Sequence, residues 1–130
     1  MQYREQIKEE LLQTGCPFLE EEPLSAHTSF KIGGPAPLFL QPDSVPKLKS
    51  ALSVLQKYQT PYFLLGNGSN VLAADEGIDC PVINLAGDFL AIRQEGENLI
   101  AGAGALYIAV CRRAMEAGLD GLQFAYGIPG

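Results

Sequence analysis

The chain has 130 residues, of which 47% are hydrophobic and 18% are charged. This length and apolar content suit one globular domain, or a domain and part of another, and exclude a disordered tail. The formal net charge of −6 comes without a cluster of lysines or arginines, which argues against nucleic acid as a partner and leaves backbone amides to meet any anionic ligand.

The first predicted element is a short amphipathic helix near the N-terminus. Tyr3, Ile7 and Leu11 recur at helical spacing, and a Thr-Gly pair follows as a stop signal. The acidic run at 20–22 comes next, just before a proline. We interpret this run as a solvated connector without a function of its own.

A strand, a helix and a second strand are predicted next. The apolar run at 38–40 predicts the first strand, apolar residues at helical spacing over 45–55 predict the helix, and "YFLL" at 62–65 predicts the second strand. This order and spacing are typical of a βαβ crossover, which makes the two strands parallel. The loop after the second strand then lies at the carboxyl edge of the sheet.

The rest of the chain predicts a meander and a last helix. Short strand candidates lie at 80–85, 89–96 and 98–105, and turn signals separate them. The last helix is expected from about Ala105 to Ala117, with Gly118 as its stop signal.

A glycine-rich loop, "GNGSN" at 66–70, follows the second strand of the βαβ unit. Successive N–H groups in such a loop can form a nest that binds an anion such as a diphosphate. Gly66 and Gly68 permit positive φ and close approach, and the other residues are short donors. A plain tight turn explains the same residues, because Asn-Gly is also a hairpin signal. The spacing fits neither a P-loop nor a Rossmann fingerprint.

Two more glycine-rich stretches lie at element junctions. "AGAGA" at 101–105 leads into the last helix, and "YGIPG" occupies 126–130. The small residues of the first stretch would let a flat cofactor or another backbone lie close, and packing of the last helix explains them equally well.

The three cysteines contain no CxxC pair, and His27 is the single histidine. This argues against a disulfide framework and against a metal site, and it fits a reducing cytoplasm. The N-terminal residues are charged throughout, and no segment reaches the about 20 apolar residues of a membrane span. We therefore expect a cytoplasmic protein with no membrane partner.

Four segments occur in an order and approximate spacing that resemble one enzyme family. They are "HTSFKIGGPA" at 27–36, "LLGNGSNVL" at 64–72, "AGAGA" at 101–105 and "GLQFAYGIPG" at 121–130. From about residue 24 onwards the chain resembles the flavoenzyme UDP-N-acetylenolpyruvoylglucosamine reductase, also called UDP-N-acetylmuramate dehydrogenase.

The resemblance implies an α+β chain with the FAD-binding fold of the vanillyl-alcohol oxidase or PCMH type. An N-terminal helix and connector (1–24) would precede a small βαβ subdomain (25–85) and the beginning of a second α+β subdomain (86–130). The second subdomain is expected to be incomplete, and the substrate-binding domain is expected to be absent, so the chain looks truncated.

The resemblance also implies that FAD is bound non-covalently, and it assigns no metal ligand. The catalytic residues are expected beyond Gly130. The implied cofactor-binding residues are Gly66, Asn67, Gly68, Ser69, Asn70, Gly102, Gly104, Tyr126, Gly127, Ile128, Pro129 and Gly130. Lys31 could approach a phosphate or cap the sheet edge, a structural role is expected for His27, and Asn84 stands where family members often have a basic residue.

In the implied reaction, NADPH reduces FAD, and the flavin then reduces the enolpyruvyl group of a UDP-sugar to give UDP-N-acetylmuramate for peptidoglycan synthesis. The UDP-sugar would bind through the absent domain. For the chain alone we expect no turnover, weak or absent FAD binding, and open sheet edges that invite self-association. Two alternatives stay open: another FAD-linked oxidase of the same fold, and a standalone binding module without catalysis.

Overall fold

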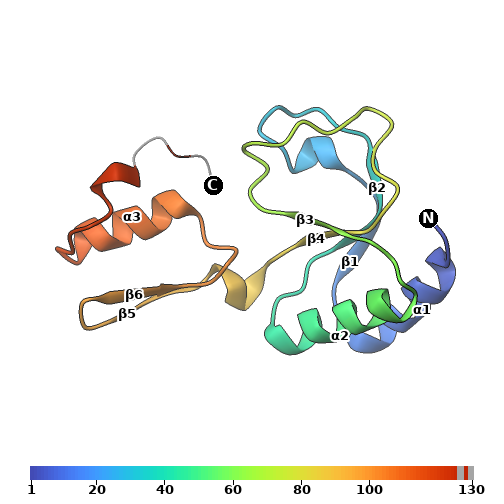
Figure 1. Ribbon diagram of the computed structural model, residues 1–130, viewed down its shortest axis with the longest axis horizontal. Helices are drawn as coiled ribbons and strands as arrows, with labels where there is room; N and C mark the ends of the chain where they lie inside the picture. The colour runs from blue at the N-terminus through green and yellow to red at the C-terminus, as the bar shows by residue number, and fades with distance from the viewer. Residues whose placement is uncertain (126–127, 129–130) are drawn as a thin grey trace.

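The computed structural model describes residues 1–125 and Ile128, and these form two lobes (Figure 1). We call residues 1–86 the first lobe and residues 87–125 the second lobe. The first lobe holds a four-stranded sheet with helices, and the second holds a two-stranded sheet with helices. The predicted α+β class is therefore confirmed.

The first lobe contains α1 (Arg4–Thr14), β1 (Phe18–Pro23), η1 (Leu24–Ala26), β2 (Pro35–Leu40), α2 (Val45–Lys57), β3 (Phe63–Leu65) and β4 (Val82–Asn84). Its strands lie in the order β1-β2-β4-β3. β1 is antiparallel to β2, whereas β2 and β3 are both parallel to β4. The predicted βαβ unit is thus confirmed, with a strand from later in the chain inserted between its two strands.

The inserted strand corrects the prediction of a meander. We expected residues 80–85 to begin a series of sequential antiparallel strands, but β4 lies at the centre of the parallel sheet. Val82 and Ile83 are buried on opposite faces, as a central strand with both faces covered requires. A run of three residues carries no local signal of this position, because its partners lie far away in the sequence.

The acidic run at 20–22 is not a connector, as we had predicted, but part of the edge strand β1. Basic residues of α1 compensate its charge: the Nζ of Lys8 lies 2.8 Å from a carboxylate oxygen of Glu20, and Arg4 pairs with both Glu20 and Glu21. The strand also pairs along its length with the apolar β2. Charged side chains at such an edge discourage pairing with other chains.

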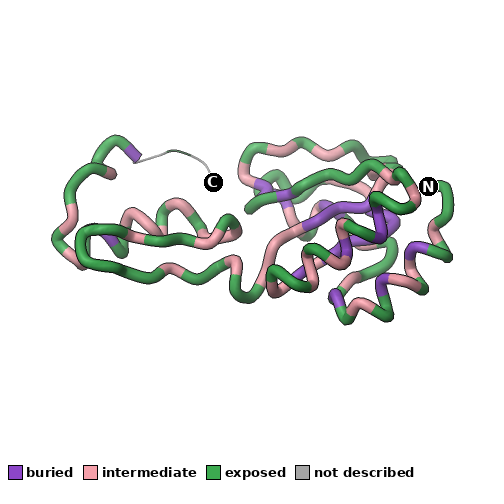
Figure 2. Tube along the Cα trace, turned by 60° about the horizontal axis from the view of Figure 1, so that its bottom comes forward, coloured by how far each residue is buried: buried purple, intermediate pink, exposed green. Residues whose placement is uncertain are grey.

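Two apolar clusters cover the two faces of the sheet. The helix face carries Ile7 and Leu11 of α1 and Leu55 of α2, all fully buried against β2 and β4. On the opposite face, Phe39 packs with Leu65 beneath η1 and the long loops. Figure 2 shows most of the buried positions in this lobe. The predicted N-terminal helix is confirmed, and so is the burial of Ile7 and Leu11, whereas Tyr3 precedes the helix and is 46% exposed.

The second lobe contains η2 (Gly87–Leu90), β5 (Ile92–Glu95), β6 (Asn98–Ala101), α3 (Tyr107–Glu116) and η3 (Gln123–Ala125). β5 and β6 form an antiparallel hairpin, and α3 confirms the predicted last helix. Among the described residues of this lobe only Ala114 and Ala125 are buried. Its N-terminal end is tied to the first lobe, where the N–H of Asp88 donates to the carbonyl of Asp43 at 2.9 Å.

Across residues 1–125, none of the helices combines the length and the apolar content that crossing a membrane requires.

Candidate functional site

The glycine-rich loop at 66–70 leaves β3 at the carboxyl end of the parallel strands, as predicted. Gly68 has a φ of 67°, whereas Gly66 does not have a positive φ, so only one of the two glycines uses the freedom that we expected. Within the described part of the chain, no N–H group from residue 66 to residue 70 donates a hydrogen bond to a protein atom. The loop thus presents the unpaired backbone donors that an anion-binding nest needs.

Gly68 lies directly against the segment that precedes β2. A Cβ atom at Gly68 would stand 1.9 Å from the carbonyl oxygen of His27. The carbonyl of Gly68 also accepts a hydrogen bond from the N–H of Ser29 at 3.0 Å. No side chain fits here, whether or not a ligand is bound, so the need for glycine at this position has a packing cause within the chain itself.

A polar pocket of about 290 Å³ lies between these two segments. Its lining residues are Ala26, His27, Thr28, Ser29, Gly66, Asn67 and Asn84. They include no lysine, arginine, aspartate or glutamate. An anion in this pocket would therefore be held by N–H groups, hydroxyls and amides, as the net charge of the chain led us to expect. Ser69 and Asn70 belong to the same loop but do not line the pocket, and neither does Lys31.

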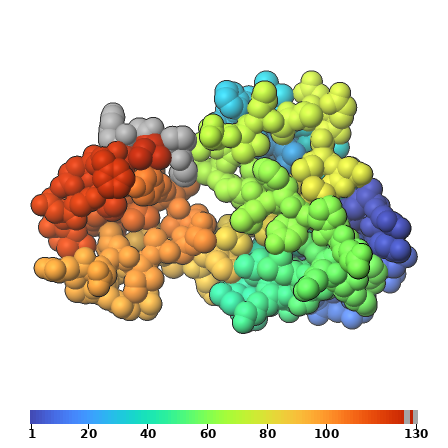
Figure 3. All heavy atoms as spheres, viewed as in Figure 1, coloured from blue at the N-terminus to red at the C-terminus, as the bar shows by residue number. Residues whose placement is uncertain are grey.

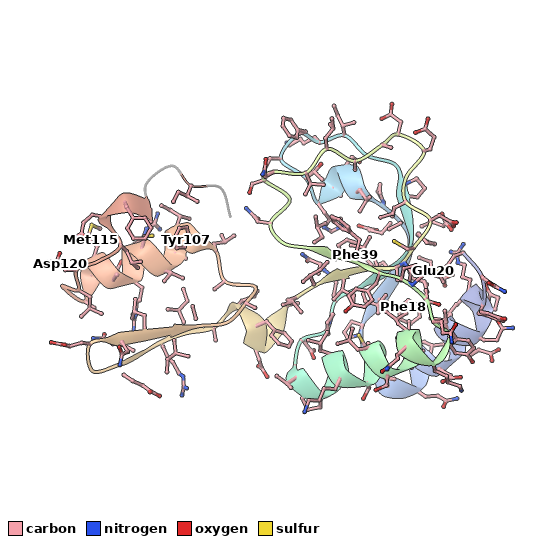
Figure 4. The ribbon with its side chains drawn as sticks, viewed as in Figure 1. Phe18, Glu20, Phe39, Tyr107, Met115 and Asp120 are labelled. Atoms are coloured by element: carbon pink, nitrogen blue, oxygen red, sulfur yellow. The ribbon has the colours of Figure 1, made fainter. Side chains whose placement is uncertain are left out.

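His27 fixes one wall of the polar pocket. Its Nε2 lies 2.8 Å from Oε1 of Glu22, and its ring stacks on Phe39 with the centroids 4.1 Å apart. Phe39 is fully buried in the first lobe (Figure 4). The backbone that packs on Gly68 is thereby anchored to the core of the lobe, which is a structural role of the kind predicted for His27.

Asn84, the last residue of β4, joins the polar pocket to the sheet. Its Nδ2 donates to the carbonyl oxygens of Leu65 and Gly66, each at 3.0 Å. These two carbonyls end β3 and begin the glycine-rich loop. Asn84 therefore fixes the start of the loop from the neighbouring strand.

A larger, mainly apolar groove of about 700 Å³ continues from the polar pocket. Gly66, Asn67 and Asn84 line both. Side chains of the first lobe such as Leu64 and Gln41 form one wall, and residues 103–107 of the second lobe form the other. Figure 3 shows the hollow between the residues coloured green and those coloured orange. The polar pocket and the groove together offer one elongated ligand a polar end and a long apolar end.

The second glycine-rich stretch contributes to this groove only in part. Gly104 lines the groove, but Gly102 packs against η2, where a Cβ atom would stand 2.1 Å from the carbonyl oxygen of Phe89. The N–H groups of both glycines are already used: Gly102 donates to Ala91 at 2.8 Å and Gly104 to Phe89 at 2.9 Å. The sequence left open the close approach of a cofactor or another backbone, and the packing of the last helix. For Gly102 the close approach of the Phe89 backbone is the explanation.

Four of the residues expected to bind the cofactor, Tyr126, Gly127, Pro129 and Gly130, lie outside the described residues. Ile128 is described, and its side chain is 48% exposed. It is not among the residues that line the polar pocket or the groove.

Sequence reasoning gave no ligand role to several groove residues. Gln41 and Tyr107 line the groove, and Ser29 lines the polar pocket. Tyr107 lies on α3 of the second lobe (Figure 4). A signal existed for Tyr107, which follows a glycine-rich strand end, but Gln41 and Ser29 reach the site only through the pairing of distant segments.

Comparisons with known proteins give a consistent result, although no protein-family model matches the chain. The chain is 44% identical over 110 residues to a UDP-N-acetylenolpyruvoylglucosamine reductase of Alkaliphilus metalliredigens, covering 85% of this chain and 36% of that protein. It is 42% identical over 114 residues to the enzyme of the same name from Clostridium botulinum (strain Hall), covering 86% and 36%.

Among solved structures, the chain resembles UDP-N-acetylenolpyruvylglucosamine reductase from Thermus caldophilus with a TM-score of 0.67. The sequence identity is 34%, and the match covers 88% of this chain and 38% of that one. The chain thus spans little more than a third of the length of the relatives that it matches.

Proposed function

We propose that this chain, which is homologous over most of its length to UDP-N-acetylenolpyruvoylglucosamine reductases, forms part of such an oxidoreductase of peptidoglycan synthesis. The whole enzyme would act in the cytoplasm on a UDP-sugar and take its electrons from NADPH. The part described here contributes the cradle for the cofactor, and its fold would be the FAD-binding fold of the PCMH type.

The observation that carries this proposal is the row of unpaired N–H groups at the carboxyl end of β3, beside a groove that turns apolar. The N–H groups of residues 66–70 would hold the diphosphate of FAD, because they are preformed donors without a partner among the described residues. The apolar groove next to Asn84 would shield one of the flat ring systems. When bound, FAD supplies the ability to pass a hydride to the substrate.

The residues present fit this cofactor in shape and charge. The polar pocket holds no carboxylate that would repel a diphosphate, and Gly66 leaves its mouth open because a Cβ there would meet no atom within 4 Å. The residues at the groove bind, orient and shield the cofactor.

Gly66→Val tests the assignment without disturbing the fold. The added side chain enters open space, so the melting temperature is expected to stay within a few degrees of the wild-type value, while its methyl groups add bulk at a residue that lines the polar pocket. Titration of the ¹⁵N-labelled chain with FAD, followed by amide chemical shifts, should then show binding weakened by at least about ten-fold. Gly68→Val is unsuitable, because its Cβ would overlap the carbonyl of His27.

ADP and riboflavin separate the two ends of the cofactor. ADP, which carries the diphosphate, should shift the amides of residues 66–70 in the wild-type chain, and riboflavin, which lacks it, should not. Shifts at 66–70 with riboflavin alone, or unchanged FAD affinity in Gly66→Val, would contradict a diphosphate nest at this loop.

A further inference from the structure

Both hydrogens of the Asn84 carboxamide are already used. The Nδ2 of Asn84 has two N–H bonds, and it makes two hydrogen bonds of 3.0 Å, to the carbonyl oxygens of Leu65 and Gly66. Because a carbonyl oxygen can only accept, these contacts fix which end of the carboxamide carries the nitrogen. The side chain has no donor left for a ligand.

The oxygen of the same side chain is free. No group in the described parts of the chain donates a hydrogen bond to Oδ1 of Asn84. Asn84 lines both the polar pocket and the apolar groove, so it stands where the two meet. A molecule that runs from one to the other must pass an acceptor that has no partner.

This arrangement distinguishes between ligands. A fully ionised phosphate offers no hydrogen to Oδ1, and the oxygen would repel it towards the N–H groups of residues 66–70. A hydroxyl group close to the phosphate would instead donate to Oδ1. Leaving such an acceptor unpaired on binding costs affinity, so the site favours molecules that carry a hydroxyl at this point.

We propose that Asn84 holds the glycine-rich loop in its binding conformation and also accepts a hydrogen bond from a sugar or ribityl hydroxyl of the bound dinucleotide. It is therefore the residue that selects a phosphate joined to a polyol over a bare phosphate. This inference rests on the proposed function and names the part of the cofactor that the junction contacts.

Asn84→Leu removes the donor and the acceptor while keeping nearly the same shape. Binding of symmetric dimethyl pyrophosphate (called pyrophosphate below), a fully ionised diphosphate diester without a hydroxyl group, should weaken by about five-fold because the loop is no longer held. Binding of FAD should weaken by about 25-fold, because a second hydrogen bond of similar worth is lost as well. Both are measured by amide chemical-shift titration of the labelled chain, with Asn98→Leu, at an exposed strand end in the second lobe, as the matched control.

Each outcome of this experiment decides a point. Equal weakening for pyrophosphate and FAD overturns the hydroxyl contact, and no weakening for either overturns the whole role of Asn84 while leaving the proposed function in place. If pyrophosphate at millimolar concentration shifts no amide of residues 66–70 in the wild-type chain, the amide nest that carries the proposed function and this inference fall together.

The amide spectrum away from β3 and β4 reports whether Asn84→Leu is folded. If it is not, Asn84→Gln serves instead, since it keeps the carboxamide but displaces it by one methylene. FAD binding should then weaken more than pyrophosphate binding, and the opposite order would overturn the proposal.

Discussion

The two lobes cover their apolar residues to very different degrees. The first lobe buries Phe39 completely beneath η1 and the long loops, and it has an apolar cluster on each face of its sheet. In the second lobe the large apolar side chains Ile108, Met115 and Phe124 are 55%, 74% and 70% exposed. The groove therefore has one wall that is built on a packed core and presents the amide nest, and one wall that belongs to a lobe whose large apolar side chains lie largely open.

The largest expected effect tests this difference directly. Phe39→Ala should lower the free energy of unfolding by about 3–5 kcal/mol, because it leaves a cavity in the first lobe and removes the ring on which His27 stacks. Phe124→Ala, in the second lobe, should change it by no more than about 0.5 kcal/mol. Urea unfolding followed by circular dichroism measures both, and similar losses would mean that the lobes are packed alike.

For a pair of glycine substitutions the order should be reversed, with the larger loss of stability in the second lobe. Gly102→Ala, in the sparsely packed second lobe, should cost about 1–3 kcal/mol because its Cβ would overlap the backbone of Phe89. Gly66→Ala, in the well-packed first lobe, should cost less than about 0.5 kcal/mol, since its Cβ meets no atom. Thermal unfolding compares the two variants. A tolerated Gly102→Ala would show that the contact with η2 does not hold the groove wall.

The smallest expected effect concerns how the stability of the first lobe depends on acidic pH. Hydrogen bonds from Lys57 and Tyr58, both at 2.5 Å, lower the pKa of the Glu10 carboxyl below its ordinary 4.5. A lowered pKa in the folded state gives stability that is complete above the ordinary value and is lost as the pH falls through the folded value. In Glu10→Gln the melting temperature should therefore fall less steeply than in the wild type as the pH is lowered.

The matched change in the second lobe is Glu95→Gln, which removes the exposed ion pair with Arg93. Exposed pairs contribute about 0–1 kcal/mol, so the melting temperature near neutral pH should hardly move. If the melting temperature of Glu10→Gln falls with pH as steeply as that of the wild type, the contact between α1 and α2 does not depend on the charge of Glu10.

Local periodicity predicted the elements whose signals lie within a few residues of each other. The N-terminal helix, the helix after β2, the hairpin and the last helix follow from such spacing, and so does the position of the loop at 66–70. The assignments that failed depend on distant partners. The acidic run becomes β1 because Arg4, Lys8 and β2 surround it, and β4 is central because the chain returns between β2 and β3.

The site shows the same division. The sequence predicted an amide nest at Gly66 to Asn70, and in the part of the chain that the structure describes those N–H groups are unpaired. The reasons for Gly68 and Gly102 could not be predicted, because the atoms that exclude a side chain belong to His27 and Phe89, which are remote in sequence. The two hydrogen bonds of Asn84 were missed for the same reason.

The insertion of β4 between β2 and β3 has a consequence for the order of folding. In the described part of the sheet β3 has β4 as its sole partner strand, so it has no ladder to join until residues 82–84 have arrived. Contacts that close a long stretch of chain form late and slow the folding rate. As the chain leaves the ribosome, β2 and α2 can assemble well before the loop at 66–70 takes its shape. The glycine-rich loop is thus one of the last parts of the first lobe to take its shape, and a nascent chain halted before Val82 does not yet present it.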